Sequence, residues 1–178
     1  MKKINVLMIA FIALALSACK DAATVKITVP DFTIDIPATV GPTRSGEGIT
    51  RAGAPFSGSY VLSINDPQFS NLKNYKNLMS GVNIQDVTIK ISRTGTNGTA
   101  TNVTLSATGV SPNFTLPSYT LGQEIQGNAT LINFVKGVIL QLKNDNVTIS
   151  ITGETDVAAG PLTVTIAVKG VQVLVETI

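Results

Sequence analysis

The residues of this sequence that could support chemistry are few. Cys19 is the single cysteine among 178 residues, and the sequence contains no histidine. A Ser-His-Asp or Cys-His catalytic group therefore cannot form, and the usual zinc ligands are missing. Ser70 and Lys73 have the spacing of Ser-x-x-Lys enzymes, but the Ser-Asp-Asn and Lys-Thr-Gly motifs that accompany it there are absent. We expect this pair to lie on a solvated helix face and the protein not to be an enzyme.

Two carboxylate pairs are the other candidates. Asp31 and Asp35 lie on one face of an expected strand, and Glu154 and Asp156 lie in an expected loop. Either pair could contribute to a calcium site, which requires about six to eight oxygen ligands. Paired acids at such positions are more often simply solvated. We therefore expect no cofactor and no metal site, while ion binding by these two pairs stays open.

The charge balance bears on the class of partner. The sequence has 13 basic and 11 acidic residues, and removing Lys2 and Lys3 leaves 11 of each. No cluster of Lys and Arg follows residue 19. A nucleic-acid partner requires a basic surface that neutralises phosphates. Nucleic-acid binding is therefore excluded.

The first 18 residues have the organisation of a secretory signal peptide. Lys2 and Lys3 precede an apolar run from Val6 to Leu16 that no charge interrupts. The run is too short to span a hydrocarbon core of about 30 Å as a permanent helix. We therefore expect residues 1–18 to be a leader that is removed.

The end of this leader is Leu16-Ser17-Ala18-Cys19. It resembles the lipobox of bacterial lipoproteins, in which an aliphatic residue and two small residues precede the cysteine. The resemblance implies that the Cys19 sulfur receives a diacylglycerol group, that the leader is cut before Cys19, and that the new N-terminus is usually acylated as well. Two or three acyl chains anchor a protein stably, whereas one chain binds only marginally.

This resemblance implies a domain order and a compartment. We expect a signal peptide at 1–18, an acylated N-terminus and tether at 19–24, and one β-rich domain at 25–178. In proteobacterial lipoproteins an aspartate directly after the cysteine favours retention in the inner membrane. This sequence has Lys20 at that position, which resembles the lipoproteins of the outer membrane. Asp21 stands alone, which departs from the acidic cluster that directs some Bacteroidota lipoproteins to the cell surface. The periplasmic face and the cell surface therefore both stay open.

Most of the remaining sequence alternates between apolar and polar residues, as strands with one buried face do. The expected strands cover 25–29, 32–36, 59–64, 82–93, 99–109, 112–126, 146–152, 162–169 and 171–175. The alternation slips by one residue at Pro30, which suggests a bulge or bend, and slips again between Ile84 and Val87 and at Gly170. Asn97-Gly98 favours a hairpin turn, and 146–152 is expected to pair with 162–169.

Two segments have a helical period. Asp66 can cap a helix that starts at Pro67, and apolar residues follow at near-helical spacing to Met79. A longer apolar stripe of period 3.6 runs through 131–142, with Asn128 as its expected cap. The sequence thus predicts a mainly β fold, an antiparallel β-sandwich of about eight strands with two covering helices at about 67–79 and 129–143.

These features favour a non-enzymatic envelope lipoprotein that is held at a membrane by Cys19. Its domain would act as a binding, adhesion or structural module through loops such as 37–58, with a protein, glycan or lipid ligand. A pocket under 131–142 would instead favour a carrier of a lipid or another hydrophobic ligand. An exposed Val171–Val175 strand would favour a fimbrial or surface-assembly subunit. An internal duplication of 67–91 and 129–152 also stays open.

Overall fold

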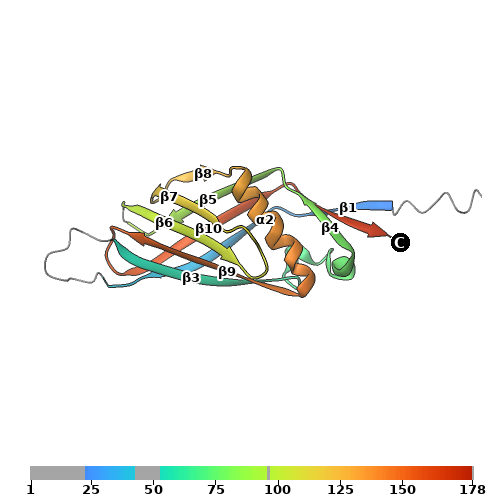
Figure 1. Ribbon diagram of the computed structural model, residues 1–178, viewed down its shortest axis with the longest axis horizontal. Coiled ribbons are helices and arrows are strands. Elements are labelled where there is room, and N and C mark those ends of the chain that lie inside the picture. Colours follow the sequence, from blue (N-terminus) through green and yellow to red (C-terminus); the bar gives the residue numbers. More distant parts are fainter. Residues whose placement is uncertain (1–22, 43–52, 96, 178) are drawn as a thin grey trace, which may run out of the picture.

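The computed structural model describes residues 23–42, 53–95 and 97–177, which form mainly antiparallel strands (Figure 1). Eight strands form one sheet in the order β7-β6-β9-β3-β2-β10-β5-β8, and three form a second sheet in the order β1-β11-β4. The strands are β1 (Ala23–Val29), β2 (Phe32–Val40), β3 (Ala54–Ser63), β4 (Met79–Asn83), β5 (Asp86–Ser92), β6 (Thr99–Ala107), β7 (Phe114–Thr120), β8 (Glu124–Gln126), β9 (Asn146–Thr155), β10 (Gly160–Lys169) and β11 (Val171–Thr177).

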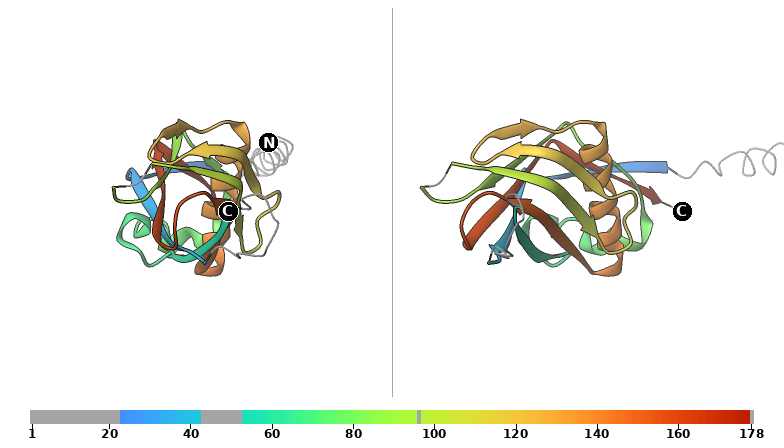
Figure 2. Two further views of the ribbon diagram at one scale, coloured as in Figure 1. Left: turned by 90° about the vertical axis from the view of Figure 1, so that its left-hand side faces the viewer. Right: turned by 60° about the vertical axis from the view of Figure 1, so that its left-hand side comes forward.

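The eight-stranded sheet folds over into two facing layers (Figure 2). β2 and β3 pair at only three positions, Ala38–Gly58, Thr39–Ser57 and Val40–Phe56. β3 then follows β9 over ten positions, and β2 follows β10 over nine. The sheet therefore divides here into the layers β7-β6-β9-β3 and β2-β10-β5-β8, whose apolar faces enclose the core. The predicted mainly β, sandwich-like fold is confirmed.

The three-stranded sheet continues three neighbouring strands of the larger one. β1 leads into β2, β4 into β5, and β10 into β11, so the order β1-β11-β4 on one side is repeated as β2-β10-β5 on the other. The frame slips predicted at Pro30, at 84–87 and at Gly170 therefore lie side by side and form one bend. The Gly170 amide donates to the Asp31 carboxylate across this bend at 2.9 Å.

The helix predicted at 129–143 is confirmed. The α-helix α2 (Ala129–Gln141) is capped by Asn128, whose side chain accepts a hydrogen bond from the Leu131 amide at 3.0 Å. It is followed by the 3-10 helix η3 (Leu142–Asn144). Five residues of its apolar face are buried: Leu131, Phe134, Val135, Val138 and Ile139. This face packs into the core beside β4, β5, β7 and β9.

The helical segment predicted at 67–79 is present as two short 3-10 helices, η1 (Pro67–Phe69) and η2 (Lys73–Leu78). Its large side chains recur every three residues, with Phe69 and Leu72 fully buried and Tyr75 and Leu78 following. A spacing of three matches the 3-10 period and not the 3.6 of an α-helix. The Phe69 ring also packs edge-on against Phe32, with ring centroids 5.0 Å apart.

Two predicted strand pairings are wrong. β9 lies between β6 and β3, and β10 lies between β2 and β5, so 146–152 and 162–169 belong to different layers. β5 and β6, on either side of Asn97-Gly98, are likewise in different layers. Alternation identifies the buried face of a strand but not its neighbour, because both layers bury the same kind of residue. The crossing at 156–159 is held by Arg93, whose guanidinium donates to the carbonyls of Ala158 and Ala159.

Candidate functional site

Cys19 lies outside the described residues, as do Lys20, Asp21 and the centre of the loop, residues 43–52. The described fold begins with β1 at Ala23, four residues after Cys19 and two residues before the predicted start of the domain. Four residues of chain reach at most about 14 Å. The start of β1 is therefore the part of the fold to which a group on Cys19 is most closely tied.

Asp31 and Asp35 are exposed on one face, as predicted. Asp31 accepts a hydrogen bond from the Gly170 amide, and Asp35 accepts one at 2.6 Å from the Thr165 hydroxyl of the neighbouring strand β10. Asp35 thus connects β2 to β10, and Asp31 connects the start of β2 to the bend between β10 and β11.

Asp156 fastens the end of β9 to β6. Its carboxylate accepts from both the amide and the hydroxyl of Thr99, each at 2.8 Å. These hydrogen bonds stabilise the charged form and hold the pKa of Asp156 below its usual range. Glu154 lies two residues away on the exposed face of β9. Across residues 23–42, 53–95 and 97–177, no three His, Cys, Asp or Glu side chains are grouped as metal ligands.

The β1 groove is an open hollow of about 530 Å³ between β1 and the η1–η2 segment. One wall is formed by residues 25–28 of β1 and the other by Ser70, Asn71, Asn74 and Tyr75. β1 is an edge strand that pairs with β11 on its other side. Val25 is 46% exposed and Tyr75 is 42% exposed. The groove therefore combines apolar side chains with two amides, three hydroxyls and one ammonium group beside a sheet edge.

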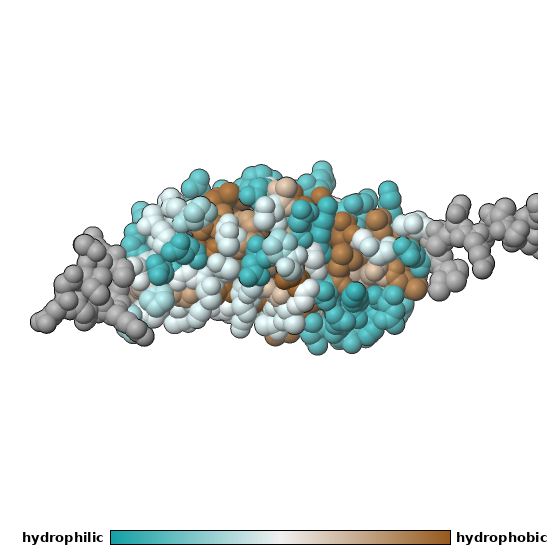
Figure 3. All heavy atoms as spheres, in the orientation of Figure 1, coloured by the Kyte–Doolittle hydropathy of each residue, from teal (hydrophilic) through white to brown (hydrophobic). Residues whose placement is uncertain are grey.

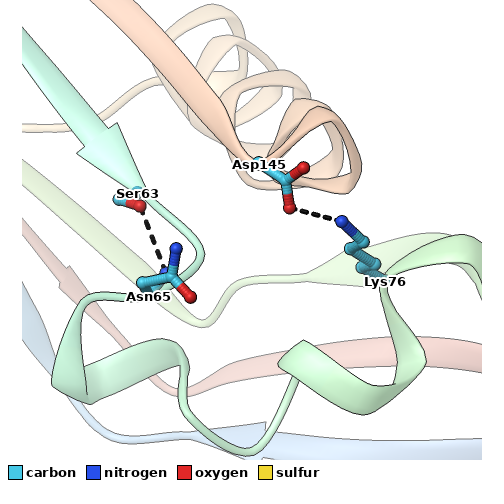
Figure 4. Close-up of polar contacts among 4 residues, drawn as sticks. All are labelled: Ser63, Asn65, Lys76 and Asp145. Carbon is cyan, nitrogen blue, oxygen red and sulfur yellow. Dashed lines mark hydrogen bonds and ion pairs between the residues drawn. The ribbon is translucent and has the colours of Figure 1, made fainter.

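The far wall of the β1 groove is fastened to the rest of the fold (Figure 4). Lys76 of η2 forms an ion pair with Asp145, which follows η3. Ser63, at the end of β3, accepts a hydrogen bond from the Asn65 amide at 3.2 Å and donates its own amide to Asp66 at 3.0 Å. Ser70 and Lys73 are both exposed on this segment, as predicted.

The Pro55 hollow lies where β2 and β3 pair, at the other end of the β1–β2 ribbon. It has a volume of about 490 Å³ and is lined by Thr39, Gly41, Pro55, Phe56, Ser57, Thr152 and Gly153. The Phe56 ring lies over Gly153, where an added Cβ would stand 2.6 Å from the ring. Fourteen residues of chain separate Val25 from Thr39, so the two lie at most about 45 Å apart along a ribbon that bends at Pro30. Figure 1 shows this ribbon running from β1 at one end of the molecule toward the other, so the two hollows lie at opposite ends.

The sequence predicts a binding site in loops such as 37–58. Residues 37–40 belong to β2 and residues 54–58 to β3, so the described part of the Pro55 hollow is formed mainly by strands.

The β1 groove is not predicted from the sequence. The groove joins segments about 45 residues apart in the chain, 25–28 and 70–75, so local patterns could not reveal it. The sequence offers one feature near the groove, the three-residue spacing of Phe69, Leu72 and Tyr75. It does not reveal that Tyr75, unlike the other two, is exposed.

No protein-family model matches this chain, and no curated protein matches it. Among solved structures, a chain from Desmodium yellow mottle tymovirus is similar over 85% of this chain and 92% of that chain, with 15% sequence identity and a TM-score of 0.32. At that TM-score the likeness carries no argument about fold or function.

Within residues 23–42, 53–95 and 97–177, no helix has the length and hydropathy that crossing a membrane requires.

Proposed function

We propose that this protein is an envelope lipoprotein that is held at the outer membrane by acyl chains on Cys19, with a β-sandwich that acts as a non-enzymatic binding, adhesion or structural module. The observation that carries the proposal is the order of features at the N-terminus. A basic start, an apolar run and Leu16-Ser17-Ala18-Cys19 are followed after three residues by the first strand of the domain. The absence of histidine and of a second cysteine supports the non-enzymatic role.

The Pro55 hollow supports a binding role for the end of the domain that lies away from β1. Its walls combine Pro55 and Phe56 with the hydroxyls of Thr39, Ser57 and Thr152. Pockets that bind ligands typically pair apolar walls with a few polar groups in this way. A module attached through β1 presents this end away from the membrane.

Two features of the fold disfavour a carrier of a hydrophobic ligand and a subunit of a surface assembly. The apolar face of α2 is buried in the core, which disfavours a carrier pocket beneath it. β11 pairs with β1 on one side and β4 on the other, and its valines Val171, Val173 and Val175 are buried. A strand held in this way is poorly suited to exchange between subunits.

The proposal is tested by the mass of the N-terminal peptide after expression of the full chain in a bacterium with an outer membrane. We expect a peptide that begins at Cys19 and carries diacylglyceryl and acyl groups. The Cys19→Ala variant should lose these groups, whereas Ser17→Ala, which keeps a small residue in the lipobox, should retain them. An unmodified wild-type chain beginning at Met1 contradicts the proposal.

A further inference from the structure

We infer that the end of the domain that carries the β1 groove rests on the lipid headgroup layer, with Val25 and Tyr75 in contact with lipid. This inference rests on the proposed acylation of Cys19 and deepens it, because it assigns the membrane-facing surface of the domain. The surface is formed by β1 and η2, far apart in sequence and adjacent in the fold (Figure 1).

The tether between Cys19 and the groove is short. Six residue steps separate Val25 from Cys19, so the chain between them spans at most about 20 Å. The acyl chains place Cys19 at the boundary of the hydrocarbon core, and the headgroup region adds only about 5–8 Å on each side of the bilayer. Tyr75 faces the same groove as Val25. The anchor therefore restricts how far this end of the domain can move from the membrane.

The surface at this end of the domain has exposed hydrophobic side chains. Three large hydrophobic side chains are exposed among the described residues, and two of them, Val25 and Tyr75, line the groove. Figure 3 shows hydrophobic surface at the end of the molecule that carries the three-stranded sheet, bordered by a hydrophilic region. Tyrosine suits a membrane interface, where its ring contacts acyl chains and its hydroxyl stays hydrated.

Charged side chains surround the groove. Lys26 of β1 and Lys73 of η2 are exposed on this end, and Lys76 beside them is paired with Asp145. Among the residues of β1, β4 and β11, Glu176 is the single acidic one. Asp66, the N-cap residue of η1, and Glu176 equal Lys26 and Lys73 in number, so this end carries no net excess of either sign. Its exposed lysines suit the phosphates of lipid headgroups. A phospholipid headgroup layer, which carries charges of both signs, is the partner that this combination fits.

The test uses the absence of tryptophan from the chain. Acylated full-length protein carrying Tyr75→Trp is reconstituted into phosphatidylcholine–phosphatidylglycerol vesicles, with and without lipids brominated near the headgroup. The matched control is Thr39→Trp, an exposed strand position at the opposite end of the ribbon. We expect about a twofold loss of emission from the Tyr75→Trp variant in brominated vesicles, because interfacial side chains lie within about 5–10 Å of the acyl boundary, and little loss from Thr39→Trp. Val25→Trp provides a second reporter with the same expectation if Tyr75→Trp does not fold.

The outcomes separate this inference from the proposed function. The mass of the Cys19 peptide is measured in the same sample, and an unacylated peptide overturns both. With Cys19 acylated, equal quenching of the groove and Thr39→Trp variants overturns the lipid contact and leaves the lipoprotein assignment standing. Protection of the groove variants from both brominated lipid and aqueous acrylamide also overturns it, since it indicates a protein in the groove.

Discussion

Tyr119 joins the two layers through a single hydroxyl. Its side chain on β7 is 2% exposed, and its oxygen accepts a hydrogen bond from the Ile91 amide of β5 at 2.9 Å. Burial raises the pKa of Tyr119 above its ordinary value, since the charged form loses hydration. The strand order places β7 and β5 in opposite layers. This hydroxyl therefore satisfies a backbone donor from the facing layer.

We expect Tyr119→Phe to destabilise the protein by about 1–3 kcal/mol, because the Ile91 amide stays buried without its acceptor. Urea unfolding of the wild type and the variant measures the loss. Tyr75→Phe is the control, since its side chain is 42% exposed and its change should lie within about 0.5 kcal/mol. Equal effects of the two substitutions would contradict the assigned role of Tyr119.

The lowered pKa of Asp156 predicts that the stability of the protein depends on pH in the acid range. Its pKa is lower in the folded chain than in the unfolded chain, so its contribution is present above the unfolded value of about 3.9 and is lost as pH falls through the folded value. Asp156→Asn removes the charge, so its stability deficit relative to the wild type should be largest near pH 7 and should shrink below about pH 4. The effect is small because the carboxylate is exposed to solvent. Urea midpoints at pH 7 and pH 3 measure it, and a deficit that does not change with pH would refute the charge effect.

At the scale of elements, the bend across β1–β2, β4–β5 and β10–β11 decides how the two sheets meet. Gly170 sits at its centre with φ +62°, a left-handed conformation that favours glycine. A Cβ there would stand 2.6 Å from the Gln85 side chain of the neighbouring strand connection. The glycine is therefore required by both backbone conformation and close approach.

We expect Gly170→Ala to lower the free energy of unfolding more than its matched control, Gly95→Ala. Gly95 has a similar φ of +70°, but no atom lies within 4 Å of the position that a Cβ would take there. Both variants carry a left-handed alanine, which costs about 1–2 kcal/mol. Gly170→Ala must also displace Gln85, and such overpacking adds about 1–3 kcal/mol. Thermal or urea unfolding distinguishes the two, and equal losses would show that the contact with Gln85 is unimportant.

The helix α2 shows why a local rule can fail. Gly137 weakens a helix in isolation by about 1 kcal/mol relative to alanine. In the fold, a Cβ at Gly137 would lie 2.8 Å from a methyl group of Val110, which precedes β7. The glycine therefore allows the chain after β6 to pack directly on the helix.

At the scale of the whole molecule, the two sheets form one structural unit, because three strand pairs run through both of them. The three-stranded sheet has no separate core, and Val171 and Val173 belong to the same buried cluster as Ile34 and Val164 of the sandwich. We therefore expect a single unfolding transition.

The Tyr75→Trp and Thr39→Trp variants check this expectation from opposite ends of the ribbon. Tryptophan emission should report the same dependence of the free energy of unfolding on urea concentration in the two variants. In each variant the emission midpoint should also coincide with the midpoint from circular dichroism. A β1–η2 end that unfolds at lower urea than the strands around Thr39 would contradict a single unit.

Local patterns in the sequence identify the buried face of most strands, the three positions where the strand frames slip, and Asn128 as the cap of α2. These features depend on neighbours within a few residues, since alternation, helical period and capping are local. The same patterns do not identify the strand residues 37–40 and 54–58, which the sequence predicts to lie in a loop. Three features follow from the tertiary structure alone: β9 and β10 lie in different layers, the segment 67–78 contains two 3-10 helices, and β1 and η2 enclose a groove. Each of these features depends on which apolar faces, distant in the sequence, pack against one another. Many strands of this chain bury equivalent faces, so local patterns cannot distinguish the possible partners.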